Sequence, residues 1–70
     1  MKDQIRSALK SNRYNLTHLA DNMGYSLTHL SNVLNKKNKA SKPFIFLLCA
    51  TVNNMTGSTF TTNDFQEYMK

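Results

Sequence analysis

The sequence predicts an all-α fold, a small domain of four to five short helices. Apolar residues recur at the i, i+3, i+4 spacing of amphipathic helices in several segments. Asn15 and Ser26 are good N-cap residues, and each stands directly before such a segment. Gly24 and Pro43 stand where helices are expected to turn or begin.

Length and composition predict one domain over residues 1–70. A chain of 70 residues is too short for two separate cores. The apolar fraction of 40% is too high for a disordered chain, and no apolar run reaches the roughly 20 residues of a membrane span. Residues 1–10 lack the apolar stretch of a signal peptide. The single Cys49 excludes an internal disulfide, and we expect a reducing, cytoplasmic location.

The first helix is predicted over Asp3–Ser11. Asp3 suits the positive end of a helix dipole. Ile5, Ala8 and Leu9 follow helical spacing and are expected to face the core.

The next two helices are predicted over Leu16–Met23, capped by Asn15, and Leu27–Leu34, capped by Ser26. Gly24 between them can adopt the left-handed conformation at low cost. The apolar positions are Leu19, Ala20 and Met23 in the first of these helices and Leu30, Val33 and Leu34 in the second. This pattern predicts a helix-turn-helix, whose second helix is placed to enter a DNA major groove.

A fourth helix is predicted to begin at Ser41 or Lys42, with Pro43 in its first turn. Its apolar face is formed by Ile45, Leu48, Cys49 and Val52.

The C-terminal part of the chain is predicted to be a loop followed by a short helix. Residues 53–62 are rich in Asn, Thr, Ser and Gly, as loops are, although residues 59–62 could form an extended piece. The last helix is expected to begin at Asn63 or Asp64, to be capped by Thr62 or Asn63, and to end at Tyr68.

The chain is basic, with a formal charge of +5. Four of its nine cations are Lys36, Lys37, Lys39 and Lys42, just after the predicted third helix. They are expected to contact DNA phosphates. The alternative is a solvated loop that keeps the protein soluble.

Residues 16–35 resemble the helix-turn-helix of the phage Cro and lambda-type repressor (XRE-like) family, and "SKPFIFLLCATVN" matches that family's fourth helix. The segment "MGYSLTHLSNVLNKK" is also similar to one helix-turn-helix of AraC-type activators, which carry two such units. The Cro-like resemblance implies a lambda-repressor-like fold. It also implies a sequence-specific transcriptional regulator of a phage or mobile element, a repressor that binds an operator as a dimer.

By the same resemblance, outward side chains of the third helix contact DNA bases. Asn32 could bond adenine, while Leu27 and Thr28 suit thymine methyl groups, so A·T pairs are expected. The implied base contacts are Ser26, Leu27, Thr28, Ser31, Asn32 and Asn35. The implied phosphate contacts are Asn15, Leu16, Lys36, Lys37, Lys39, Ser41 and Lys42.

A module of this size is expected to bind double-stranded DNA as a homodimer. The candidate interface lies in the C-terminal third and consists of Phe44, Leu47, Met55, Phe60, Phe65 and Tyr68, with residues 56–70 contributing. Each aromatic could instead pack the core, which is the favoured interpretation for Phe44, while the two are equal for Phe60 and Phe65.

No catalytic, cofactor or metal site is predicted. His18 and His29 lie on different helices with no cysteine nearby, and no Gly-rich phosphate loop or paired carboxylates occur. The sequence therefore predicts that the chain is not an enzyme.

The alternative function is a helix-turn-helix module that acts on a protein partner, as an antirepressor or inhibitor, because the third helix carries no charge.

Overall fold

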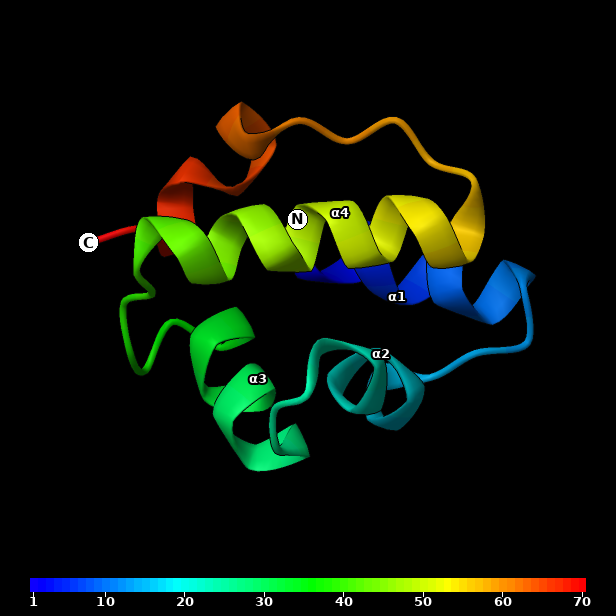
Figure 1. Ribbon diagram of the computed structural model, residues 1–70, viewed down its shortest axis with the longest axis horizontal. Helices are drawn as coiled ribbons and strands as arrows, with labels where there is room; N and C mark the ends of the chain where they lie inside the picture. Colours follow the sequence, from blue (N-terminus) through cyan, green and yellow to red (C-terminus); the bar gives the residue numbers. More distant parts are fainter.

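The computed structural model describes residues 1–70 and is all-helical, which confirms the predicted fold class (Figure 1). It has five helices: α1 (Lys2–Ser11), α2 (Leu16–Met23), α3 (Leu27–Leu34), α4 (Lys42–Thr56) and the 3₁₀ helix η1 (Thr62–Tyr68). No helix has the length and apolar character needed to cross a membrane.

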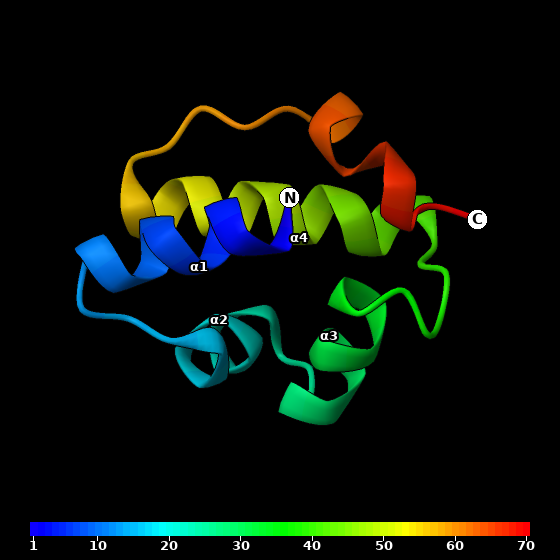
Figure 2. The same ribbon diagram turned by 180° about the vertical axis from the view of Figure 1, so that it is seen from behind.

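Helix α4 is the element around which the others are arranged. Figures 1 and 2 show α1 running alongside α4, with α2 and α3 on one side and the C-terminal segment on the other. Contacts join α4 to α1, α2 and η1, and join α2 to α3. The core consists of 16 buried residues, none of them charged.

The ends of α2 and α3 are set by local contacts that the sequence predicted. The Asn15 Oδ1 atom accepts from the His18 N–H (3.0 Å), and His18 Nδ1 accepts from the Asn15 N–H (3.1 Å). Ser26 Oγ accepts from the His29 N–H (3.1 Å). Gly24 ends α2 with φ 76°, a conformation that side chains with a Cβ disfavour. Both helices therefore have the predicted bounds.

The C-terminal half of α4 differs from the prediction. The loop expected from Asn53 begins only after Thr56, where Gly57 ends the helix with φ 68°. The helix continues because Val52 is buried in the core and the side chain of Asn53 is held by Phe60. The Asn-rich composition favoured a turn, and tertiary contacts overrode that preference.

The last helix also begins earlier than expected and is a 3₁₀ helix. Its cap is Thr61 rather than Thr62 or Asn63, since Asp64 Oδ2 accepts from the Thr61 N–H (2.9 Å). The segment before it forms no strand. After it, Ala40 and Met69 form an isolated parallel bridge, so the C-terminus is tied to the loop before α4.

Candidate functional site

A groove of about 520 Å³ lies where α1, α2 and α3 meet. Residues from all three helices and from the α1–α2 connection line it: Arg6, Leu9, Lys10, Tyr14, Asn15, Leu16, Thr17, Leu27 and Ser31. Its volume is in the range of small-molecule sites in proteins.

The groove carries positive charge without a compensating carboxylate. Arg6 and Lys10 are one turn apart on α1, and both line it. No Asp or Glu lines the groove, and neither cation takes part in an ion pair. Two adjacent, uncompensated cations create a positive potential that attracts anions.

The start of α2 adds backbone donors to the same groove. Helical geometry leaves the N–H groups of Leu16 and Thr17 without partners inside the helix, whereas Asn15 satisfies the N–H of His18. The first turn of α2 contains no acidic residue. Unpaired amides at a positive helix end can bind an anion.

The groove also has an apolar part, formed by Leu9, Tyr14, Leu16 and Leu27. The side chains of Tyr14 and Leu27 are 39% and 43% exposed, Leu16 is half-buried, and Leu9 is buried. The groove therefore combines a cationic, hydrogen-bonding part with an apolar part.

Two of the residues expected to contact bases, Leu27 and Ser31, line this groove. Of the others, Ser26, Thr28 and Asn35 are exposed and Asn32 is half-buried. Asn35 is bonded at both ends of its amide, since Nδ2 donates to Ser31 Oγ (3.2 Å) and Oδ1 accepts from Lys2 Nζ. The base-contact roles themselves stay predictions.

The expected phosphate contacts are split between two places. Asn15 and Leu16 line the groove. The lysine loop, which carries Lys36, Lys37, Lys39 and Lys42, follows the C-terminal end of α3. There Lys36 Nζ is 2.7 Å from the Glu67 carboxylate, and Lys39 Nζ donates to the Glu67 carbonyl (3.4 Å). The remaining three, Lys37, Ser41 and Lys42, are exposed.

Glu67, near the C-terminus, joins the lysine loop to the N-terminus of the chain, a connection that the sequence did not predict. Its carboxylate also lies 3.7 Å from the N-terminal ammonium of Met1. The hydrogen bond from Lys36 is the main cause that lowers the pKa of Glu67. Two of the four clustered lysines thus serve a contact within the chain.

Three of the residues proposed for a dimer interface are in the core. Phe44, Phe65 and Tyr68 are at most 4% exposed, so they are unavailable to a second copy in this fold. This confirms the core interpretation favoured for Phe44 and the core alternative for Phe65, and it corrects the interface role expected of Tyr68. Phe44 packs edge-on against Tyr25 and Phe65 against Phe60. Leu47 is 37% exposed, and Met55 and Phe60 are half-buried.

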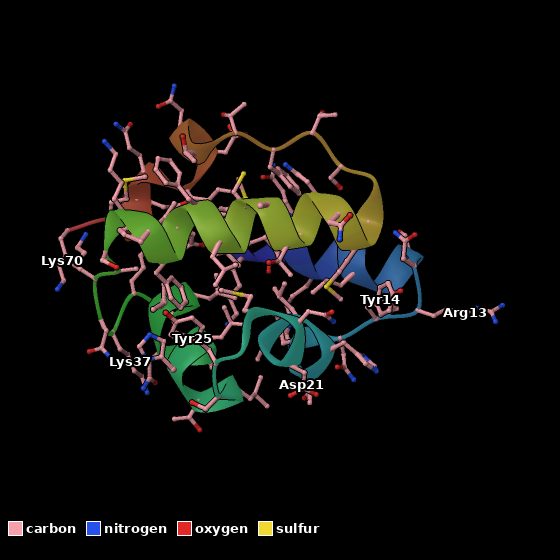
Figure 3. The ribbon with its side chains drawn as sticks, in the orientation of Figure 1. Arg13, Tyr14, Asp21, Tyr25, Lys37 and Lys70 are labelled. Atoms are coloured by element: carbon pink, nitrogen blue, oxygen red, sulfur yellow. The ribbon has the colours of Figure 1, made fainter.

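Both histidines have structural contacts. His18 completes the cap of α2 and meets the Tyr14 ring edge-on, with centroids 5.6 Å apart. His29 stacks on Tyr25, with centroids 5.2 Å apart. Tyr25 appears between α3 and α4 in Figure 3.

The protein belongs to a family of enzymes. The family model described as aminotransferase class I and II matches residues 3–70, so the chain belongs to the class I and II aminotransferases. No curated protein and no solved structure matches the chain.

This match corrects the function expected from the sequence. The predicted function, a DNA-binding transcriptional regulator of the Cro type, was wrong, and so was its alternative, a module acting on a protein partner. The prediction that the chain is not an enzyme was also wrong. The physical reason is that a helix-turn-helix is a way to pack two short helices, and a packing pattern does not define an activity.

The family implies pyridoxal phosphate, which needs a desolvated lysine for its Schiff base and a partner for its ring nitrogen. Lys10 lines the groove but is exposed, and no lysine of the chain is buried. No carboxylate is buried, and none faces the groove. These residues therefore do not fit the cofactor.

Proposed function

We propose that the groove binds the carboxylate of an amino acid or a 2-oxo acid, the small molecules between which aminotransferases move an amino group. The observation that carries this proposal is the convergence of two cations, Arg6 and Lys10, with the N-terminal amides of α2 in a groove without acidic residues.

The geometry of the donors suits a carboxylate. A guanidinium such as that of Arg6 can bond both carboxylate oxygens, while Lys10 adds a point charge. The amides of Leu16 and Thr17 supply donors that need no rearrangement. Because the groove is open to water, we expect dissociation constants in the millimolar range, on the order of 4 kcal/mol of binding free energy.

The proposal assigns substrate binding to these residues and leaves the cofactor to others. No lysine or carboxylate of the chain fits the Schiff base or the ring nitrogen of pyridoxal phosphate, so the proposal concerns the substrate carboxylate alone. Double-stranded DNA and a second copy of the chain as partners stay predictions, as does the cytoplasmic location.

The test is a titration of the ¹⁵N-labelled full chain with pyruvate at constant ionic strength. Saturable shifts of the Leu16 and Thr17 amides are expected, and Arg6→Gln should weaken binding about tenfold, the loss of one charge-assisted pair. Arg13→Gln is the matched control, because Arg13 does not line the groove and points away from the molecule in Figure 3.

Two results would contradict the proposal. One is the absence of shifts at these amides. The other is an equal loss of binding in the Arg6 and Arg13 variants, which would indicate non-specific attraction to a basic protein. A short DNA duplex serves as a further arm. If it shifts the same amides at concentrations where pyruvate has no effect, phosphate rather than carboxylate is the bound group.

A further inference from the structure

We propose that the exposed start of α4 and the lysine loop form a docking surface for an anionic lipid membrane, which the protein contacts without crossing it. None of the residues of this surface lines the groove, so the proposal is independent of the function proposed above. The surface consists of the exposed side chains of Tyr25, Phe46 and Leu47 and of the lysines Lys37, Lys39 and Lys42.

The apolar part of this surface lies on the solvent side of the N-terminal half of α4. Phe46 and Leu47 are 49% and 37% exposed, whereas their neighbours Ile45 and Leu48 are buried in the core. The chain exposes five large hydrophobic side chains, of which Phe46 has the largest exposed fraction. Two of the five line the groove, and the other three belong to this surface. Apolar side chains exposed together, rather than singly, mark a surface that a partner covers.

Tyr25 joins this surface through its contact with α4. Its ring meets the ring of Phe44 edge-on, with centroids 4.9 Å apart, while 40% of the residue stays exposed. Tyrosine suits the boundary between a membrane and water, because its ring is apolar and its hydroxyl group is polar.

The lysine loop places positive charge at the same end of α4. Lys42 is the first residue of this helix and stands one turn before Phe46, so both side chains lie on its exposed side. Figure 3 shows Lys37 at the end of the molecule where α4 begins. Lys36 is paired with Glu67, whereas Lys37 and Lys42 take part in no ion pair. These two cations are therefore free to attract an anionic surface.

Backbone hydrogen bonds hold the lysine loop in place. The Lys37 N–H donates to the Asn32 carbonyl (2.9 Å) at the end of α3. Further along the loop, the Ala40 N–H donates to the Tyr68 carbonyl (2.8 Å). The lysines thus project from an ordered backbone, which lowers the entropy cost of bringing them to a partner together.

The combination of charged and apolar side chains favours a lipid surface over other partners. Anionic headgroups attract lysines, while the boundary beneath the headgroups takes up apolar side chains. The phosphates of a nucleic acid would pair with the lysines but leave Phe46 and Leu47 in water. A second copy would cover these two side chains but offer no carboxylate to the lysines, because α4 contains no Asp or Glu and Glu67 is already paired.

The experiment is co-sedimentation of the full chain with vesicles of phosphatidylcholine, either alone or mixed with an equal part of phosphatidylglycerol. The chain is expected to sediment with the anionic vesicles only. The double variant Lys37→Gln/Lys42→Gln should weaken this binding about twentyfold, since each lysine near an anionic membrane contributes about fivefold. Phe46→Ala should weaken it about fivefold, because less apolar area leaves water.

Two variants serve as matched controls. Arg13→Gln removes a cation that Figure 3 shows at the end of the molecule opposite Lys37, and it should change vesicle binding by less than about twofold. Leu27→Ala truncates a side chain that is 43% exposed but lies in the groove, and it should leave vesicle binding unchanged.

Several results would overturn this proposal. One is equal sedimentation with both kinds of vesicle, or with neither. Another is unchanged binding by Phe46→Ala, since charge alone would then account for the attachment. A short DNA duplex that binds through Lys37 and Lys42, when the anionic vesicles do not bind, would assign the lysines to nucleic acid. A dimer in the absence of vesicles that Phe46→Ala dissociates would assign the apolar part to a second copy. None of these results affects the pyruvate titration, so the groove is tested separately.

Discussion

The side chain of Asn53 forms two hydrogen bonds with the backbone of Phe60. Its Nδ2 atom donates to the Phe60 carbonyl (2.8 Å), and its Oδ1 atom accepts from the Phe60 N–H (2.9 Å). Cys49, one turn earlier on α4, donates its thiol to the same carbonyl (3.2 Å). The segment between α4 and η1 has no strand partner, so these side chains supply the hydrogen bonds that a ladder would otherwise provide.

Replacing Asn53 with Ala should therefore destabilise the protein by about 2 kcal/mol, since two half-buried hydrogen bonds are lost at about 1 kcal/mol each. Urea unfolding followed by circular dichroism measures this change. Asn54→Ala is the control, because Asn54 is exposed on the same helix, and it should change stability by less than about 0.5 kcal/mol. Equal losses in the two variants would show that the Phe60 contact does not stabilise the fold.

The same contact shows which parts of the fold could be predicted from sequence. The bounds of α2 and α3 depend on Asn15, Ser26 and Gly24, whose effects are local. The end of α4 depends on Phe60, seven residues away, and on burial that only the folded chain defines. Composition therefore favoured a loop at Asn53 where the helix continues.

The candidate site was predicted in part, and for a different ligand. Asn15, Leu16, Leu27 and Ser31 were expected to bind DNA, and the structure brings them into one groove. The cations of α1 were missed because a charged residue on an exposed helix face has no distinctive pattern. Arg6 becomes informative only when packing places it beside the starts of α2 and α3.

Glu67 should make stability depend on pH in the acid range. Its pKa is lowered by Lys36 and the N-terminal ammonium. A group with a lowered pKa in the folded state stabilises above its unfolded pKa, and this contribution is lost as pH falls through the folded pKa. Unfolding by urea at pH about 6 and about 3 should show a smaller decrease for Glu67→Gln than for the unchanged chain. The control is Asp21→Asn, at an exposed residue without an ion pair, which should show the same decrease in stability as the unchanged chain. If Glu67→Gln also shows that same decrease, the ion pairs of Glu67 do not stabilise the fold.

Tyr68 should act in the opposite direction at alkaline pH. Burial is the main cause that raises the pKa of its phenol above the ordinary value of 10.0, and the charge of Glu67 adds to it. When folding raises the pKa of a phenol, its contribution to protein stability is fully present below the unfolded pKa. That contribution is lost as the pH rises through the folded pKa. Tyr68→Phe should flatten the loss of stability measured between pH about 9 and about 11. Tyr25→Phe, at an exposed ring, is the control, and an unchanged slope in Tyr68→Phe would count against a buried phenol.

Cys49 should react slowly with alkylating reagents while the protein is folded. The side chain is buried, and burial is the main cause that raises the pKa of its thiol, so the reactive thiolate is both scarce and shielded. Labelling with iodoacetamide at neutral pH, followed by mass spectrometry, should be at least about a hundredfold faster in denaturing urea, since the native protein reacts only when it opens. Similar rates in both conditions would mean that the segment around Phe60 does not cover the thiol.

Gly24→Ala should destabilise the protein by about 1–2 kcal/mol, the cost of placing a Cβ in the left-handed conformation. The space around Gly24 contributes nothing to this cost, because an added Cβ would meet no atom within 4 Å. Gly24→Asn should therefore cost less, since Asn tolerates this conformation. Gly57 provides an internal comparison, with φ 68° against 76° and equally open surroundings. Urea unfolding should give similar losses for Ala at both positions. Clearly unequal losses at Gly24 and Gly57 would show that the left-handed backbone conformation is not the source of the cost.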